Sequence, residues 1–308
     1  MLLLFPIRVI LGTAPTCYDR NGNTFPGLEV STIFTKPYST DVLTDAQIIF
    51  IAQQLPSPKA TTGRPAYSNQ ELLPGILRVL RSGCRWRDLN LPGYPDGSTH
   101  WRRLRLWRRG LHFRWLWKRI LKRLDEQNPQ EKELRLKRLS IDGALLQSFE
   151  FKEKTGYSGK HRRVGVKASL IVDATGLPLS VVLARGNAAD IALAEDTLSR
   201  ISEYDSFKTT ILADKGYDSR RFRKFAFCHG IYPRIPKRSY TTEGKDPYRS
   251  HMYRYDKDEA KYRFIVERTN AWFKSFRRLR NRFDYHVASF ELWLYLAIII
   301  VCVRRLVL

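Results

Sequence analysis

The sequence predicts an α/β protein, with a mixed sheet flanked by helices and a small all-α domain before it. From Leu43 to about residue 124, apolar residues recur at helical spacing. From residue 138 on, short runs rich in β-branched residues alternate with helical segments. The order there is three strands, helix, strand, helix, strand, helix, which is typical of an α/β fold whose first strand is central.

Residues 1–42 show no sustained period and contain four prolines. We interpret them as an extension that need not be ordered, and we expect the patterned chain to begin at Leu43. The next segment, 43–125, is predicted to be a helical DNA-binding domain. Its helices are expected from a Thr44 or Asp45 cap to residue 55, from 69 to about 81, and from a Ser98 or Thr99 cap to 106 with a continuation to 124.

Helices joined by short turns, with a basic last helix, are compatible with a helix-turn-helix that reads DNA. A helical bundle whose basic face only contacts phosphates fits the sequence equally well. Polar residues around Pro129 favour a domain boundary between 125 and 136, so that the second domain spans 137–308.

The second domain is expected to open with an antiparallel meander of three strands. Two further strands, each preceded by a helix, follow, and a long amphipathic helix comes after them. The ranges are 138–145, 164–172 and 177–183 for the meander, then helix 187–201, strand 209–213, helix 221–227, strand 231–235 and helix 261–279. The apolar run 290–303 is too short to span a bilayer and is predicted to be a buried core helix.

The charge of the chain points to its partners. There are 54 Lys and Arg residues against 30 Asp and Glu, which leaves +24. Such a surplus favours nucleic acid first and an anionic membrane surface second. Basic residues alternate with aromatic ones over 101–109, including Arg102 and Arg103, which suits a folded DNA-binding surface. The four cysteines form no metal-binding or disulfide pattern, so we expect a reducing cytoplasm.

Three carboxylates carry the chemical prediction. Asp142 lies in the first predicted strand, and Asp214 ends the fourth. If these strands pair in parallel, both aspartates lie at the same edge of the sheet. Glu267 lies on the polar stripe of helix 261–279, together with Arg263, Asn270, Lys274 and Arg278, opposite the apolar face.

Carboxylate oxygens suit Mg²⁺ or Mn²⁺, and two such ions about 4 Å apart activate the attacking oxygen and stabilise the leaving one in phosphodiester chemistry. Arg263 and Lys274 are expected to hold phosphates nearby. Each acid also has a structural alternative: Asp142 and Asp214 as turn residues before glycines, and Glu267 as the ion-pair partner of Arg263 one turn earlier.

The chain resembles the DDE transposases of bacterial insertion sequences, of the insertion-sequence four/five type. The resemblance rests on Ile141-Asp142-Gly143, on the run 212–218 around Asp214, and on Arg263, Glu267 and Lys274 at the spacing of the family's Glu motif. The segment 44–107 is similar to the family's N-terminal helical domain, so the resemblance covers about residues 43–305. The tyrosine that usually lies three residues before the arginine is replaced by Ala260, with Tyr262 beside Arg263.

The resemblance implies a ribonuclease-H-like core with Asp142, Asp214 and Glu267 as catalytic residues and ligands of two Mg²⁺ ions. It also implies binding to the terminal inverted repeats of the element, cleavage by water to free 3′-hydroxyls, and attack of these hydroxyls on target DNA. We expect Arg263, Lys274, Arg278, Arg102 and Arg103 to bind DNA. Members of the family act as homodimers or larger synaptic complexes on double-stranded DNA, in the bacterial cytoplasm at the nucleoid.

Two other functions remain open. A nuclease of the same fold would cut without joining, since both steps use the same metal site. A DNA-binding relic or repressor with an inactive core would keep the basic surface, but the three intact carboxylates argue against it. A membrane-surface role has no support from a basic helix with a clean apolar face.

Overall fold

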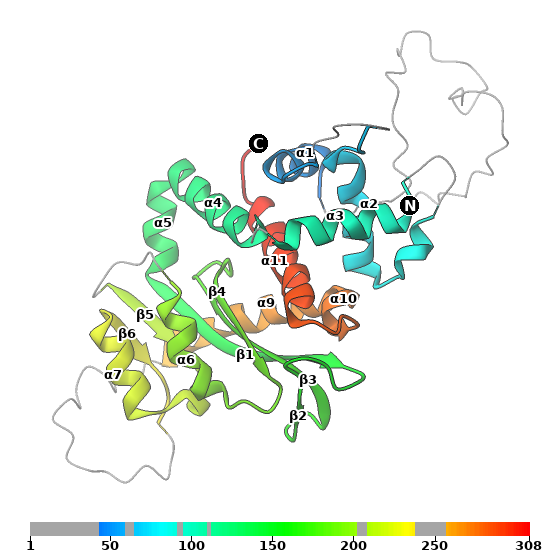
Figure 1. The fold of residues 1–308 in the computed structure, drawn as a ribbon. Helices are drawn as coiled ribbons and strands as arrows, with labels where there is room; N and C mark the ends of the chain where they lie inside the picture. Colours follow the sequence, from blue (N-terminus) through cyan, green and yellow to red (C-terminus); the bar gives the residue numbers. More distant parts are fainter. Residues whose placement is uncertain (1–42, 59–64, 91–94, 110–111, 202–207, 238–256) are drawn as a thin grey trace, which may run out of the picture. The chain divides into compact units, whose positions relative to one another are not determined.

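The computed structural model describes residues 43–308 except 59–64, 91–94, 110–111, 202–207 and 238–256. The predicted extension 1–42, the basic turn after residue 58 and most of the Tyr-rich loop 236–257 therefore lie outside the described residues. Figure 1 shows the arrangement of helices and strands.

The first half is helical, as predicted. Capping boxes begin two of the helices: the Thr44 hydroxyl accepts from the Gln47 amide, and Ser68 pairs in the same way with Glu71. The third helix begins two or three residues earlier than expected, and its cap is Asp96 rather than Ser98 or Thr99, because the Asp96 carboxylate accepts from the Thr99 amide. The elements are α1 (Asp45–Gln54), α2 (Asn69–Ser82), the 3₁₀ turn η1 (Trp86–Leu89), α3 (Gly97–Arg109) and α4 (His112–Gln127).

A further helix, α5 (Pro129–Leu136), occupies the segment that we expected to be an irregular boundary. Pro129 lies in its first turn, where the missing amide hydrogen costs no helical hydrogen bond. The proline that suggested a break therefore starts a helix.

The second half contains a seven-stranded mixed sheet within the described residues (Figure 1). β1 pairs antiparallel with β3 and parallel with β5, β3 continues antiparallel to β4, and β5 pairs parallel with β6. The predicted meander and the central first strand are thus confirmed. The short strands β2 and β7 were not predicted. The strands are β1 (Arg138–Ser148), β2 (Gly156–Ser158), β3 (Arg163–Val172), β4 (Pro178–Arg185), β5 (Thr209–Leu212), β6 (Ile231–Arg234) and β7 (Asn281–Arg282).

Helices cover this sheet. α6 (Asp190–Ser199) packs on β3 and β4, α7 (Arg220–Cys228) packs on β6, and α9 (Phe264–Ser275) packs on β1 and β3. Seven successive residues of β4 are buried, so both of its faces are covered. The mixed α/β fold with flanking helices and a preceding helical region is as predicted.

The predicted helix 261–279 is interrupted. It consists of the 3₁₀ turn η3 (Lys261–Arg263), α9 and the short α10 (Arg277–Arg280), preceded by a turn of helix, α8 (Lys257–Ala260). The backbone of Phe276 is extended, and its ring is buried with that of Phe273. The break turns the chain so that both rings enter the core.

The last helix, α11 (Val287–Val303), is buried along nearly its whole length, which confirms the predicted core helix. It packs against α4 from the helical region, so a continuous hydrophobic core runs from α1 and α4 to the sheet (Figure 1). No helix in the described part of the chain is both long enough and apolar enough to cross a bilayer. The division into domains at 125–137 remains a prediction.

Candidate active site

The parallel pairing of β1 with β5 brings two of the predicted carboxylates together. Ser140 lies beside Leu212, and the same offset of 72 residues separates Asp142 from Asp214. Asp214 follows the last residue of β5, at the carboxyl end of a parallel strand, where α/β sheets place their sites. The register therefore puts the backbones of Asp142 and Asp214 on neighbouring paths.

Asp214 also shapes its own turn. Its carboxylate accepts a hydrogen bond from the Gly216 amide at 2.7 Å and caps the 3₁₀ turn η2 (Lys215–Tyr217). The structural alternative for this residue is thus present, but this bond uses a single carboxylate oxygen. Farther along, Asp218 accepts twice from the buried guanidinium of Arg223, which also donates to the Ile235 carbonyl. This pair fixes the loop after β5 to α7 and to the end of β6.

Asp142 is half-buried, and a side chain of α9 holds it. The Asn270 amide donates to Asp142 Oδ2 at 3.0 Å. Burial raises the pKa of Asp142 above its usual range, while the bonds from Asn270 and from the Gly143 amide, and the charge of Arg263, act in the opposite direction. Asn270 is itself only 6% exposed, so it does not lie on the solvent-facing stripe where we expected it. Its position three residues after Glu267 on one helix was the signal that was missed.

Among the three predicted catalytic acids, Glu267 is the one that faces solvent most. Its side chain is 51% exposed and accepts from Arg263 at 2.6 Å, four residues earlier at the end of η3. The ion pair that we considered as the structural alternative therefore exists. Within the described ranges, no group of three or more Asp, Glu, His or Cys side chains is close enough to hold a metal ion. The helix that carries Glu267 nevertheless packs on β1 through the Asn270–Asp142 bond.

Asp190 is a further carboxylate beside Asp142, and the sequence prediction did not include it. It begins α6 and forms an ion pair of 2.9 Å with Lys167 of β3. A Cβ atom at position 143 would lie 2.0 Å from Asp190 Oδ1, so the residue after Asp142 has to be glycine. In the sequence, Asp190 appears only as an acid in the first turn of a predicted helix. An acid at that position is usually explained by its favourable interaction with the helix dipole.

Tyr217 lies among these acids. It is 1% exposed, and its hydroxyl makes no hydrogen bond to any described residue. Burial, followed by the negative charges of Asp190, Asp142 and Asp214, raises the pKa of Tyr217 well above its usual value. The phenol is therefore neutral, and its hydroxyl lies within the electrostatic reach of all three carboxylates.

Cations lie beside this acidic group. Burial, followed by the charges of Lys160, Lys274 and Lys167, lowers the pKa of His161 in the turn between β2 and β3. Lys274 of α9 and Lys167 of β3 thus lie within electrostatic reach of His161 in that turn. Lys274 is one of the predicted phosphate-binding residues, and a cluster of lysines with like charge is suited to an anionic ligand.

Two predicted DNA-binding arginines are used inside the protein, which corrects the prediction. Arg278 is 8% exposed, pairs with Asp284 at 3.1 Å and packs on the rings of Phe283 and Trp293. Arg103 is 5% exposed and donates to the Asn69 side chain and the Tyr67 carbonyl. Both guanidinium groups bind other parts of the chain and do not face solvent.

The other cationic predictions remain accessible. Arg102 is exposed on α3, and Arg263 is about one-third exposed beside Glu267. Tyr262, which precedes Arg263, stacks against Arg138 with 3.8 Å between the guanidinium carbon and the ring centre. Ala260 lies one residue before η3, in α8.

Comparisons with known proteins show which family the chain belongs to. A family model for the transposase DDE domain matches residues 134–302, and one described as a putative transposase of the IS4/5 family matches residues 43–121. A putative transposase for insertion sequence element IS402 of Burkholderia cepacia is 32% identical over 157 residues, 48% of this chain and 68% of that protein. The uncharacterized 16.2 kDa protein of insertion element IS402, from the same organism, is 32% identical over 120 residues, 37% of this chain and 79% of that protein. No solved structure matches the chain significantly.

Proposed function

The chain belongs to the DDE transposases of the IS4/5 type, and we propose that it cuts and joins DNA strands at Asp142, Asp214 and Glu267. We further propose that its substrates are the terminal inverted repeats of an insertion sequence and the target DNA into which they are joined. The +24 charge supports a polyanionic substrate.

The observation that carries the assignment is the parallel register of β1 and β5. It pairs Ser140 with Leu212, and Asp142 and Asp214 each follow two residues later, although 72 residues separate them in sequence. Asn270 then ties Asp142 to α9, the helix that bears Glu267. Asp142, Asp214 and the helix that carries Glu267 thus belong to elements that are linked through β1, which supports the proposal that the three acids act together.

Enzymes of this family use divalent metal ions. We propose Mg²⁺, with Mn²⁺ as a substitute, and two ions per site, held by Asp142, Asp214 and Glu267. Carboxylate oxygens are the ligands these ions prefer, and the aspartates fit without a change of backbone register. When bound, the ions activate the attacking oxygen and stabilise the charge of the leaving one. Glu267 joins the site when its carboxylate turns away from Arg263.

The remaining residues position the acids and the DNA. Asn270 fixes the orientation of Asp142, because its amide occupies one carboxylate oxygen. Lys274, beside Lys160, and Arg263, once it is released from Glu267, bind phosphates on either side of the reacting one. Arg102 on α3 contacts DNA at a distance from the chemistry.

The assembly and the location follow from the same proposal. Joining two ends of one element needs two active sites, so we propose a homodimer or a larger synaptic complex on DNA. The place of action is the bacterial cytoplasm at the nucleoid.

The experiment is cleavage of a labelled duplex that carries the ends of the element flanking the gene. Wild type is compared with Asp142→Asn, Asp214→Asn and Glu267→Gln, in Mg²⁺, in Ca²⁺ and in EDTA. The expected result is nicking by wild type in Mg²⁺ only, and a loss of at least about 100-fold in each variant with DNA binding retained. Asp196→Asn is the matched control, because Asp196 is an exposed acid paired with Arg200 and lies outside the site.

A pre-cut end with a free 3′-hydroxyl then separates joining from cutting. Transfer of this end to a second duplex supports a transposase, whereas cutting without transfer would leave a nuclease. Binding without metal-dependent cutting by wild type would leave a DNA-binding relic.

A further inference from the structure

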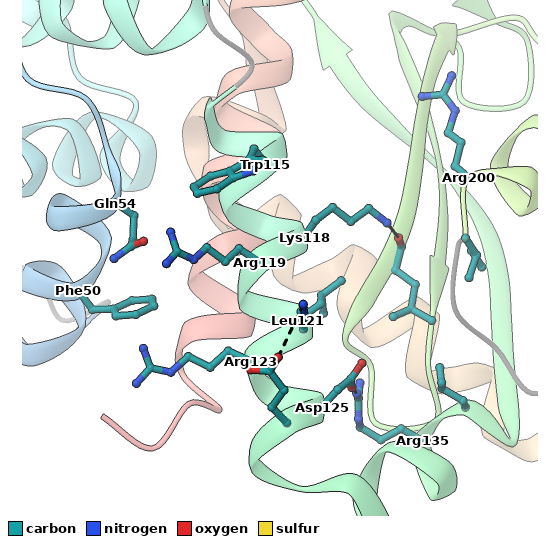
Figure 2. A pocket seen from close by; sticks show the side chains of 15 residues that line it. Phe50, Gln54, Trp115, Lys118, Arg119, Leu121, Arg123, Asp125, Arg135 and Arg200 are labelled. Carbon is teal, nitrogen blue, oxygen red and sulfur yellow. Dashed lines mark hydrogen bonds and ion pairs between the residues drawn. The ribbon is translucent and has the colours of Figure 1, made fainter.

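A cationic cavity lies away from the candidate active site. It measures about 940 Å³ and is bounded by α1, α4, the end of α5, the start of β4 and the end of α6 (Figure 2). None of the carboxylates or lysines assigned to the active site lines it. Six cations and two acids line it: Lys118, Arg119, Lys122, Arg123, Arg135 and Arg200, with Asp125 and Glu126.

The two acids of the cavity are already neutralised. Asp125 pairs with Arg135 and, at 3.3 Å, with Lys132. Glu126 lies 3.9 Å from Lys122, one turn away on α4. The surplus positive charge in the cavity is therefore not cancelled by its own walls.

Arg119 and Arg123 carry this surplus. Both are exposed, one turn apart on the same side of α4, and no described acid lies within ion-pair distance of either. Each guanidinium lies over an aromatic ring at 5.1 Å from its centre, Arg119 over Trp115 and Arg123 over Phe50. In Figure 2 both side chains point from α4 toward α1, into the cavity. Trp115 is 55% exposed, which is unusual for a tryptophan that only supports the fold.

This geometry suits phosphate. A guanidinium stacked on a ring is held in one plane, and its N–H groups remain available at the edge for bidentate bonds to phosphate oxygens. Four helical residues rise about 6 Å, close to two steps of about 3.4 Å along one strand of a duplex. Two successive arginines of α4 can thus follow one DNA backbone.

We propose that this cavity is a second DNA-contact surface, which binds backbone phosphates of duplex DNA outside the bond that is cut. The proposal rests on the proposed function for the identity of the polyanion. Leu136 at the cavity wall ends α5, and β1 leads from Arg138 to Asp142, four residues or about 13 Å farther on. About four base pairs of duplex span that distance, so one DNA molecule can reach both places.

The test measures binding of a fluorescent 30-base-pair duplex of mixed sequence by anisotropy, without divalent metal, over a series of salt concentrations. For Arg119→Gln/Arg123→Gln we expect about tenfold weaker binding at 150 mM salt and a slope of log affinity against log salt that is smaller by about 1.8, since each phosphate contact contributes about 0.9. Arg119→Lys/Arg123→Lys keeps the charge, and its slope is expected to stay near that of wild type. Thermal melting of each variant confirms that it is folded.

The matched control is Arg220→Gln/Lys224→Gln. These exposed cations are also one turn apart, but lie on α7, which does not line the cavity. An equal loss of DNA affinity in the control and in the α4 variant would show that only the net charge matters and would overturn the proposal. An unchanged slope of log affinity against log salt in the α4 variant would overturn it as well. Wild type that binds but never cuts would overturn the proposed function and leave the cavity to be judged on binding alone.

Discussion

At the scale of single residues, Tyr217 is a buried polar side chain without a hydrogen-bond partner among the described residues. Its hydroxyl is fully buried among acids and bonded to no described residue, although a buried polar group normally finds a partner. A fold that only needed the ring would be served as well by phenylalanine.

Tyr217→Phe is therefore expected to raise the free energy of unfolding by about 1 kcal/mol, because it removes a buried hydroxyl that makes no bond. Urea unfolding at constant pH measures this. Tyr295→Phe is the control, since the Tyr295 hydroxyl donates to Glu291 at 2.8 Å and its loss should destabilise the protein by a similar amount. A clear loss of stability in Tyr217→Phe would show that the hydroxyl has a partner.

The same scale shows what the sequence could predict of the site. Asp142, Asp214 and Glu267 could be proposed from the sequence because acids at strand ends and on a polar helix face stand out from the hydrophobic pattern, and their catalytic role remains a prediction. Asn270, Asp190 and Tyr217 could not be assigned, since their roles depend on which oxygen or hydroxyl comes near Asp142 after folding. Arg103 and Arg278 were mistaken for surface cations because burial of a charge depends on a partner that periodicity does not reveal.

Among the elements, the contact of α2 with α3 depends on a glycine within a helix. Gly75 lies in the middle of α2, where glycine is unfavourable, and the buried ring of His100 on α3 occupies the space beside it. A Cβ atom there would lie 2.3 Å from His100 Nε2. The two helices approach closely because one side chain is absent.

Gly75→Ala is expected to lower the free energy of unfolding. Overpacking against His100 costs about 1–3 kcal/mol. The higher helix propensity of alanine offsets roughly 1 kcal/mol of that cost. Denaturant unfolding measures the change. Gly159→Ala is the matched control, because nothing lies within 4 Å of a Cβ atom at that position. In Gly75→Ala/His100→Ala the clash is removed, so a double-mutant cycle should show a favourable coupling; additive losses would contradict the contact.

Element types were predicted better than element ends. Apolar residues recur about every 2 residues in strands and about every 3.6 residues in helices, and these periods identified the long elements. The strands β2 and β7 are too short to show a period. The break at Phe276 depends on where two rings find space in the core, which the sequence pattern around it does not encode.

For the molecule as a whole, α11 joins what we predicted to be two domains. Its buried side chains pack against α4 as well as against the sheet. A helix that is apolar on all sides needs cover from every direction, and the predicted catalytic domain supplies only part of it.

We therefore expect the chain to unfold in a single cooperative transition, with equal calorimetric and van't Hoff enthalpies. Scanning calorimetry of the full chain measures both. A chain made of residues 137–308 alone should expose the face of α11 that α4 covers, and should aggregate or bind a hydrophobic dye. Two separate transitions, with a well-folded 137–308 fragment, would show instead that the boundary near residues 125–137 divides independent units.

The pairing of β1 with β5 also has a kinetic consequence. These two strands, which lead to Asp142 and Asp214, are not neighbours in sequence, since the rest of the meander and α6 lie between them. Non-local parallel pairing of this kind forms late, since the entropy of closing the long loop has to be overcome first. A nascent or partly unfolded chain therefore keeps the two aspartates of the proposed site apart, and the proposed site is complete only when the sheet is complete.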